Sequence, residues 1–237
     1  MSQSDQFNGR LGLIFASIGA AIGTGNIWRF PRMVGANGGG TFLIPWLIFL
    51  FAWSIPLVIA EYAMGKRSRT GTIGTFRIFA GRRFAWMGLW TAWISTAIGF
   101  YYAVVSGWTL KYFQLGITGA LNGEGVDTTE VWNAFLQSPG QVIFFQFIVI
   151  LLVLGTIWKG AKAIEKVNFY LMISLFALLF LTLFLSLWMD LSDGSLDGAL
   201  FMFTVDFDML MEPEVWINGL SQSAWSCSAG MGMCITY

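Results

Sequence analysis

Two glycine-rich interruptions lie inside long apolar segments of this chain, one near each end. The first is Gly-Thr-Gly at residues 23–25, followed directly by Asn26, and the second is Gly-Met-Gly at residues 230–232. In lipid every backbone N–H and C=O group must be paired, so a broken membrane helix persists only where the freed groups face protein, water or a ligand. Both interruptions are therefore candidate binding sites for an ion or a small polar ligand.

The first interruption has the chemistry of a cation site. Unwinding there would free main-chain carbonyl groups for an ion, namely those of Gly19, Ala21 and Ile22. Asn26 adds a neutral side-chain oxygen, while the N–H groups of Thr24 and Gly25 would face an anionic group. Ligation by oxygen alone suits a hard alkali cation, and the chain has no histidine that would favour a transition metal. The alternative is that Gly19 and Gly23 form a small-residue packing face, which is common in membrane helices.

The composition is that of an integral membrane protein built from helices. Hydrophobic residues make up 56% of the 237 residues and charged residues only 11%, against roughly a quarter charged in soluble domains. A spanning helix needs about 20 mainly apolar residues. Six segments meet this requirement, with interruptions near 22–25 in the first and near 229–232 in the last: approximately 11–34, 41–64, 84–112, 141–158, 164–189 and 214–237. Because the sequence has no histidine and no paired nucleophile and base, it does not predict an enzyme.

The charged residues predict how these segments cross the membrane. The loops at 65–83 and 159–163 are rich in Lys and Arg, whereas the loops at 113–140 and 190–213 are rich in Asp and Glu. By the positive-inside rule the basic loops are cytoplasmic and the acidic loops external, which leaves the N-terminus in the cytoplasm of a multi-pass plasma-membrane protein. The zero net charge is the sum of these opposed patches and gives no indication of nucleic-acid binding. The expected partner of the apolar surface is the lipid bilayer.

Three motifs stand near the start of the sequence: Arg-Leu-Gly-Leu at 10–13, Gly-Thr-Gly-Asn-Ile-Trp-Arg-Phe-Pro at 23–31 and Asn-Gly-Gly-Gly-Thr-Phe at 37–42. These motifs resemble the neurotransmitter:sodium symporter family, and in particular its bacterial LeuT-like amino-acid transporters. Others follow in order along the chain, at 55–56, 61–65, 101–102, 108–110, 159–160, 164–166, 216 and 222–232. The resemblance implies an all-α LeuT-type fold of two inverted repeats of five helices. The chain would supply the N-terminal portion, spans 1–5 and the first half of span 6, and the missing second repeat would be required for a complete site.

The same resemblance implies two sodium sites. The first would use the carbonyl of Ala21, the side chain of Asn26, the hydroxyl of Ser226 and, in amino-acid carriers, the carboxylate of the substrate. The second would use the carbonyls of Gly19 and Ile22, together with ligands from a later helix that the chain lacks. Sodium is therefore the expected coupling ion.

The resemblance also implies a substrate site at the two interruptions. The hydroxyl of Tyr102 would hold the substrate carboxylate, and Arg29 and Trp225 would form an external gate. The implied substrate-binding residues are Ala21, Gly23, Thr24, Gly25, Ile98, Tyr102, Trp225, Ser226, Ser228 and Met231. Without the resemblance, Tyr102 would be interpreted as an interfacial or core aromatic residue, which is the commoner role of a membrane tyrosine. Trp225 and Met231 would then be packing residues.

Gly23 points to the class of substrate. Family members that carry monoamines have an aspartate at the matching position, whereas glycine leaves room for a substrate that brings its own carboxylate. An α-amino acid is therefore the expected cargo. Met231 is flexible and polarizable, which favours a large hydrophobic or aromatic side chain on that amino acid.

Trp46 and Glu61 complete the comparison with the family. Trp46 stands where chloride-dependent members have a tyrosine, which argues against chloride dependence, although Gln222 and Ser226 match the chloride site. Glu61 lies inside the second span, where ionisable residues are rare. The resemblance implies that Glu61 bonds the backbone around the second interruption.

The sequence therefore predicts a sodium-coupled secondary active symporter of amino acids that works by alternating access. Two alternatives remain open. One is a non-transporting, half-length membrane module that assembles with a partner through small-residue faces. The other is a carrier of the same fold for betaine-like or γ-amino-acid solutes.

Overall fold

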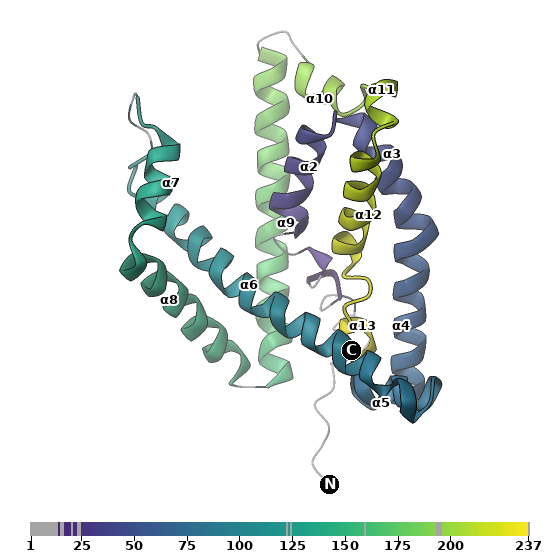
Figure 1. The fold of residues 1–237 in the computed structure, drawn as a ribbon. Helices are drawn as coiled ribbons and strands as arrows, with labels where there is room; N and C mark the ends of the chain where they lie inside the picture. The colour runs from purple at the N-terminus through teal and green to yellow at the C-terminus, as the bar shows by residue number, and fades with distance from the viewer. Residues whose placement is uncertain are drawn as a thin grey trace. The chain divides into compact units, whose positions relative to one another are not determined.

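The structure is a computed structural model that describes residues 14, 17–19, 21–22, 25–121, 123, 125–158, 160–192 and 196–236. These residues form helices joined by turns, with no β-strand among them. They belong to two compact units (Figure 1). Unit 1 comprises Met1–Asp5 and Trp93–Ile164, and unit 2 comprises Gln6–Ala92 and Glu165–Tyr237. Each unit is described by itself.

The first interrupted helix of unit 2 resumes as a π-helix. This segment, η1 (Gly25–Arg29), leads into α2 (Phe30–Ala36), which carries Pro31 in its first turn. Proline is tolerated there because the N–H group it lacks would have no partner inside the helix. After the C-cap residue Asn37, Gly38 and Gly39 adopt positive φ angles of 76° and 59°. This glycine turn connects α2 directly to the next span.

The next span is one long helix with a π segment in its middle. It consists of α3 (Gly40–Phe49), η2 (Leu50–Ser54) and α4 (Ile55–Ser68). A π segment accommodates an extra residue in a helix and is frequent at functional sites. At the end of η2 the buried Ser54 hydroxyl donates to Ser223 Oγ at 2.9 Å. The span continues into α5 (Gly71–Phe79) and the short η3 (Arg82–Phe84).

The last part of unit 2 is a second interrupted helix. α12 (Pro213–Cys227) ends where Ser228 adopts a left-handed φ of 53°. Gly230 and Gly232 follow with φ angles of 80° and 72°, and α13 (Met233–Thr236) then begins. Positive φ favours glycine, so the two glycines account for where the helix is interrupted.

Small residues bring the second interrupted helix close to its neighbours. A Cβ atom placed on Gly219 of α12 would lie 3.0 Å from the backbone nitrogen of Trp46 on α3. A Cβ atom on Gly65 of α4 would lie only 2.3 Å from the backbone oxygen of Ile235 on α13. Such close approach of backbones is the usual function of glycine in membrane helix packing. α3 and α4 therefore hold α12 and α13 on either side of the interruption.

The remaining elements of unit 2 are α9 (Ala161–Ser192), most of which belongs to this unit, α10 (Asp197–Phe201) and α11 (Phe207–Leu210). The segment around α10 and α11 covers the glycine turn after α2. The backbone N–H of Asp206 donates to Thr41 Oγ1 at 2.8 Å, and a Cβ atom on Gly39 would meet the backbone oxygen of Phe201. This contact ties the loop after α9 to the start of α3.

Unit 1 contains most of α6 (Ala85–Ile117), together with α7 (Thr128–Leu136) and α8 (Pro139–Ile157). α6 and α8 approach closely at Gly107, where a Cβ atom would lie 3.0 Å from the backbone nitrogen of Gln146. Asp127 caps α7, since its carboxylate accepts from the N–H groups of Thr129 and Glu130 at 2.7 Å and 3.3 Å. These hydrogen bonds stabilise the charged carboxylate and lower the pKa of Asp127.

Four helices among the described residues are long and apolar enough to cross a membrane: Gly40–Ser68, Arg82–Ile117, Pro139–Ile157 and Ala163–Ser192. At most 17% of the apolar window of any of them is buried inside the structure. Such uncovered apolar helices need lipid around them, because water would make their exposure costly. The chain is a multi-pass membrane protein.

Candidate ion and substrate site

The interruption between α12 and α13 is held by a buried carboxylate. Glu61 of α4 is 3% exposed, and its Oε1 accepts from the backbone N–H of Gly230 at 2.8 Å. On the α12 side, the N–H of Ala229 donates to the carbonyl of Ala224 at 3.0 Å. The predicted bond between Glu61 and the interrupted backbone is therefore confirmed. It supplies an acceptor for an N–H group that the broken helix cannot pair.

Asn26 joins the two interrupted helices. Its Nδ2 donates to the carbonyl oxygen of Ala21 at 2.6 Å and to that of Ser226, 200 residues further along the chain, at 3.1 Å. Its Oδ1 accepts from Gln222 Nε2 at 3.3 Å. The amide nitrogen of Asn26 thus faces the two carbonyls, and the predicted role of its side-chain oxygen as an ion ligand stays a prediction. The nitrogen faces them because two partly negative carbonyl oxygens attract a donor and repel a third oxygen.

Gln222 is the centre of the polar network beside Asn26. It is fully buried, and its Oε1 accepts from one guanidinium nitrogen of Arg29. Its Nε2 lies 3.4 Å from Ser226 Oγ, which also accepts from Trp46 Nε1 at 3.3 Å. The second guanidinium nitrogen of Arg29 donates to Ser221 Oγ at 3.1 Å. The charge of Arg29 is therefore directed at neutral oxygens of α12.

Oxygen atoms of both interrupted helices belong to the hydrogen-bond network formed by Asn26 and Gln222. They are the carbonyls of Ala21 and Ser226, the hydroxyl of Ser226 and the amide oxygen of Asn26 itself. All are neutral, and such oxygens can hold a hard cation. No group of three or more His, Cys, Asp or Glu side chains that could hold a metal occurs among the described residues.

The other predicted residues around the first interruption lie on both sides of it. Gly19 faces α9, because a Cβ atom there would lie 3.9 Å from Asn168 Nδ2 and from Met172 Sδ. The N–H of Ile22 donates to the carbonyl of Ile18 at 2.7 Å, which makes the helical turn before the interruption intact. Gly25 is the first residue of η1, while the predicted Gly23 and Thr24 lie outside the described residues.

Three predicted substrate residues lie at the end of α12 and in the interruption. Ser228 is 5% exposed, and Trp225 and Met231 are half-buried. Ser226 is half-buried as well and carries the hydrogen bonds to Trp46, Gln222 and Asn26. These four residues therefore lie at the end of α12 and in the interruption after it, which is the part of unit 2 that Asn26 contacts through Ser226.

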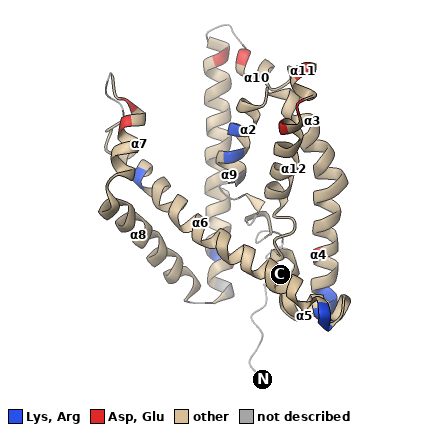
Figure 2. Ribbon diagram, in the orientation of Figure 1, with Lys and Arg blue, Asp and Glu red and all other residues tan. Residues whose placement is uncertain are grey.

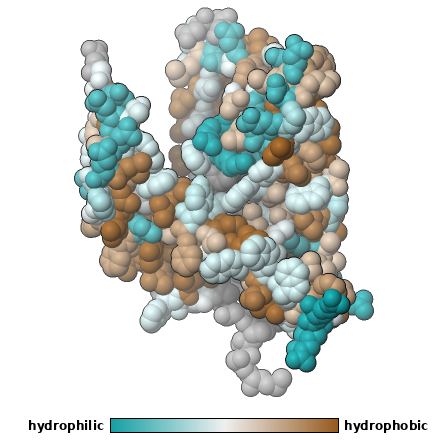
Figure 3. All heavy atoms as spheres, viewed as in Figure 1, coloured by the Kyte–Doolittle hydropathy of each residue, from teal (hydrophilic) through white to brown (hydrophobic). Residues whose placement is uncertain are grey.

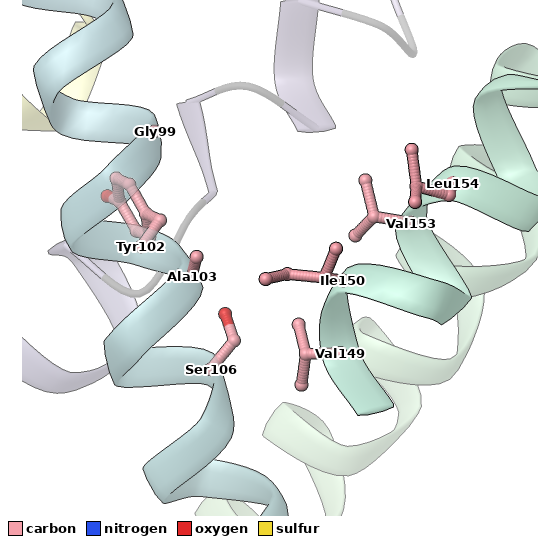
Figure 4. Close-up of a pocket in the computed structure, with 8 residues that line it drawn as sticks. All are labelled: Gly99, Tyr102, Ala103, Ser106, Val149, Ile150, Val153 and Leu154. Carbon is pink, nitrogen blue, oxygen red and sulfur yellow. The ribbon is translucent and has the colours of Figure 1, made fainter. Parts of the chain in front are cut away.

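Ile98 and Tyr102 lie on α6 in unit 1. The ring of Tyr102 packs edge-on against Tyr101, with 5.7 Å between their centroids. Tyr102 also lines a cavity of about 320 Å³ between α6 and α8. Figure 4 shows Ala103 and Ser106 of α6 facing Ile150 of α8 across this cavity. Its lining is mainly aliphatic, and Ser106 adds a hydroxyl group to it.

The central position of Gln222 was not among the predicted binding residues. The sequence did carry a signal, because Gln222 and Ser226 are four residues apart and so share a helix face. A buried amide at membrane depth is also costly unless it is hydrogen-bonded. Ser221 gave no such signal, since a hydroxyl in a membrane helix commonly bonds its own backbone.

Comparisons with known proteins identify the family. A sequence profile of the "Sodium:neurotransmitter symporter family" matches residues 4–137 and 135–237. The uncharacterized sodium-dependent transporter YhdH of Bacillus subtilis (strain 168) is 31% identical over 98% of this chain, which covers 51% of that relative. The uncharacterized sodium-dependent transporter MJ1319 of Methanocaldococcus jannaschii is 32% identical over 99% of this chain, and the match covers 49% of it.

An animal transporter is similar to this chain as well. The sodium-dependent neutral amino acid transporter SLC6A17 of Rattus norvegicus is 31% identical over 98% of this chain, and the match covers 35% of SLC6A17. The chain thus spans about half the length of YhdH and MJ1319 and about a third of SLC6A17.

A solved structure is similar over the same residues. The crystal structure of MhsT in complex with L-phenylalanine matches 99% of this chain and 53% of that chain, with a TM-score of 0.86 and 32% sequence identity. The predicted all-α, LeuT-type fold is confirmed by this match. Given the profile match over nearly all residues and the close structural agreement, the chain belongs to the sodium:neurotransmitter symporter family.

Proposed function

We propose that this chain carries the first-repeat part of the sodium and substrate site of a symporter that takes up amino acids by alternating access, and that the second repeat completes this site. The observation that supports the proposal is the side chain of Asn26, which joins the carbonyls of Ala21 and Ser226 across the two interrupted helices. Interrupted helices at the membrane midplane are where secondary transporters bind their substrate and coupling ions. The family is one of symporters, and the relatives YhdH and SLC6A17 are named as sodium-dependent.

Sodium would bind among the neutral oxygens beside Asn26. A cation between the Ala21 carbonyl and the Ser226 hydroxyl would attract oxygen atoms and repel N–H groups. The Asn26 amide would therefore rotate to present Oδ1 to the ion. Because Asn26 also bonds α12, binding of the ion would order both interruptions together. The carbonyls of Gly19 and Ile22 would serve a second sodium ion.

The substrate would place its carboxylate at this sodium ion. The N–H groups of Thr24 and Gly25 and the hydroxyl of Tyr102 would complete its binding. Gly23 would leave room for that carboxylate, as glycine adds no side chain. The side chain of the amino acid would contact four further residues: Ile98, Trp225, Ser228 and Met231.

We propose a large hydrophobic or aromatic amino acid as the cargo. Met231 is adaptable, and MhsT, which is 32% identical to this chain over the matched residues, was crystallised with L-phenylalanine. Arg29 and Trp225 would close the site on the external side. Coupling to chloride is not part of the proposal, since Trp46 fills the tyrosine position of chloride-dependent members and bonds Ser226.

The N-terminus would lie on the cytoplasmic side of the plasma membrane. The basic segment at 66–83 and the acidic residues of α10 and α11 occur at opposite ends of unit 2 (Figure 2). By the positive-inside rule the basic end faces the cytoplasm. The same orientation places α12 so that it enters the membrane from outside.

A binding measurement tests the proposal. A transporter that joins this chain to the second repeat of the family is purified in lipid nanodiscs. It is incubated with radiolabelled phenylalanine in sodium chloride and, separately, in potassium chloride of equal concentration. We expect saturable binding in sodium that is lost in potassium. Asn26→Ala should weaken this binding at least about tenfold, because it removes hydrogen bonds to both interrupted helices. Gly35→Ala, which introduces a methyl group into open space on α2, should leave it unchanged.

Two results would contradict the proposal. Equal binding in sodium and potassium would show that sodium is not the coupling ion. Sodium-dependent binding by Asn26→Ala with unchanged affinity would show that Asn26 is not part of the site. Competition by unlabelled glycine betaine, but not by leucine or tryptophan, would replace the amino acid by a betaine-like cargo.

A further inference from the structure

A strongly basic surface lies at the end of α4 and continues over α5 and η3. It contains six cations: Lys66, Arg67, Arg69, Arg77, Arg82 and Arg83. All six are exposed, and residues 66–83 contain no acid. Figure 2 shows the cations gathered at α5, and Figure 3 shows a hydrophilic patch at the same place. No acidic side chain in the described part of the chain pairs with any of them. We call these six residues the basic surface.

Large apolar side chains are interleaved with these cations. On α5, Ile73, Ile78 and Phe79 are 46%, 56% and 46% exposed, and beside it Phe84 and Trp86 are 43% and 60% exposed. A surface segment that presents Arg and Lys together with exposed Ile and Phe is typical of segments that lie in the membrane interface. An aqueous protein partner alone would not account for so much exposed apolar surface next to the charges.

Hydrogen bonds and close packing fix α5 to the ends of two spans. Arg69 adopts a left-handed φ of 53°, and its N–H donates to the carbonyl of Gly65 at 2.9 Å. The buried Thr75 hydroxyl shares a hydrogen bond with Ser68. At the start of α6, a Cβ atom on Gly88 would lie 2.6 Å from the backbone oxygen of Thr72. The basic surface is therefore held where α4 leaves and α6 enters the membrane.

We propose that the basic surface binds the phosphate groups of anionic phospholipids in the leaflet that it faces. Arg can donate two parallel hydrogen bonds to one phosphate, and five of the six cations are arginines. Clusters of four to eight Lys and Arg beside a span are typical of anionic-lipid recognition. The exposed side chains of Ile78 and Phe79 enter the acyl region between the bound headgroups. The inference rests on the orientation proposed above, in which this leaflet is the cytoplasmic one.

The test measures which lipids remain bound to the purified chain. The protein in mild detergent is mixed with equal amounts of phosphatidylglycerol and phosphatidylcholine of the same acyl chains, and the retained lipids are counted by native mass spectrometry. At low salt we expect phosphatidylglycerol to exceed phosphatidylcholine by about tenfold or more. Near 1 M salt, where charges are screened beyond about 3 Å, the excess should largely disappear.

Paired variants show whether the basic surface causes this preference. Arg77→Gln with Arg82→Gln should lower the excess about threefold or more, since each cation near an anionic surface adds to the attraction. Arg77→Lys with Arg82→Lys keeps the charge and should retain most of it. Arg32→Gln with Lys111→Gln removes the same charge elsewhere and should have no effect. Circular dichroism shows whether each variant is folded.

Three outcomes would overturn the inference. They are equal retention of the two lipids by the unmodified chain, a preference that persists in high salt, and the same loss of preference in both glutamine pairs. The measurement needs neither sodium nor amino acid, so its failure is distinct from a failure of the proposed transport function. An acidic protein partner would be indicated if the chain bound acidic peptides but showed no lipid preference.

Discussion

Replacing Gly65 with alanine should weaken the packing of α13 against α4. A Cβ atom at Gly65 would lie 2.3 Å from the backbone oxygen of Ile235 and 2.9 Å from its carbonyl carbon and Cα. Both positions are buried, and the atoms in the way belong to the main chain, which cannot rotate aside as a side chain can. The variant can therefore fold only if α13 moves away from α4.

The magnitude follows from two opposing effects. Overpacking a close contact costs about 1–3 kcal/mol, whereas alanine in place of glycine inside a helix gains about 0.5–1 kcal/mol. Subtracting the gain from the cost leaves a loss of up to about 2.5 kcal/mol in the free energy of unfolding, and we expect the middle of that range, about 1–2 kcal/mol. For a chain of this length, each kcal/mol lowers the melting temperature by roughly 2–4 °C. Gly65→Ala should thus melt about 2–8 °C below the unmodified protein.

Thermal unfolding in mild detergent, followed by tryptophan fluorescence, measures this difference. The matched control is Gly35→Ala in α2 of the same unit, where a Cβ atom would meet no other atom within 4 Å. The control should melt at the temperature of the unmodified protein or slightly above it. If Gly65→Ala melts no lower than Gly35→Ala, the backbone of α13 does not lie against α4 and the reasoning is refuted.

Two further predictions concern Gln222 and Asp127. Gln222→Leu removes the acceptor of Arg29 and the donor to Asn26, so it should reduce the free energy of unfolding by about 1–3 kcal/mol. Thermal unfolding measures this loss. A loss no greater than that of Ser221→Ala would contradict the prediction. Asp127 has a lowered pKa in the folded chain, so its stabilisation of α7 is complete above the ordinary carboxylate pKa and is lost as the pH falls through the lowered value. Hydrogen exchange of the first α7 amides, corrected for intrinsic rates, should therefore accelerate in acid in the unmodified chain but not in Asp127→Asn, which caps without titrating.

The fold was predictable because lipid imposes a simple pattern on the sequence. Long apolar segments report contact with the bilayer directly, and glycines mark where a helix cannot continue. The sequence predicted an interruption near 229–232, and the structure has α12 ending at Cys227 and α13 beginning at Met233. The bond from Glu61 to Gly230 was also predicted, though only through the resemblance to the family.

The details of the polar network were not predictable from the sequence. The π-helices η1 and η2 shift the helix register by one residue. Such a shift cannot be recognised from the spacing of apolar residues, because it changes the backbone and not the composition. The partners of Arg29 depend on which face of α12 approaches η1, and that is decided by contacts such as Gly219 against α3. Which end of the Asn26 amide faces the Ala21 carbonyl depends on all of its neighbours, and the sequence does not give them.

The contact between Glu61 and Gly230 also has a consequence for the order of folding. The two residues are 169 positions apart, and a ribosome adds about 5–20 residues per second. At that rate α4 exists for roughly 8–34 s before the N–H group that its carboxylate accepts has been made. During synthesis Glu61 must remain solvated by water or by a temporary partner at the insertion machinery. Closure of the second interruption onto α4 therefore cannot begin until Gly230 has been made, and α4 must persist for that time without this contact.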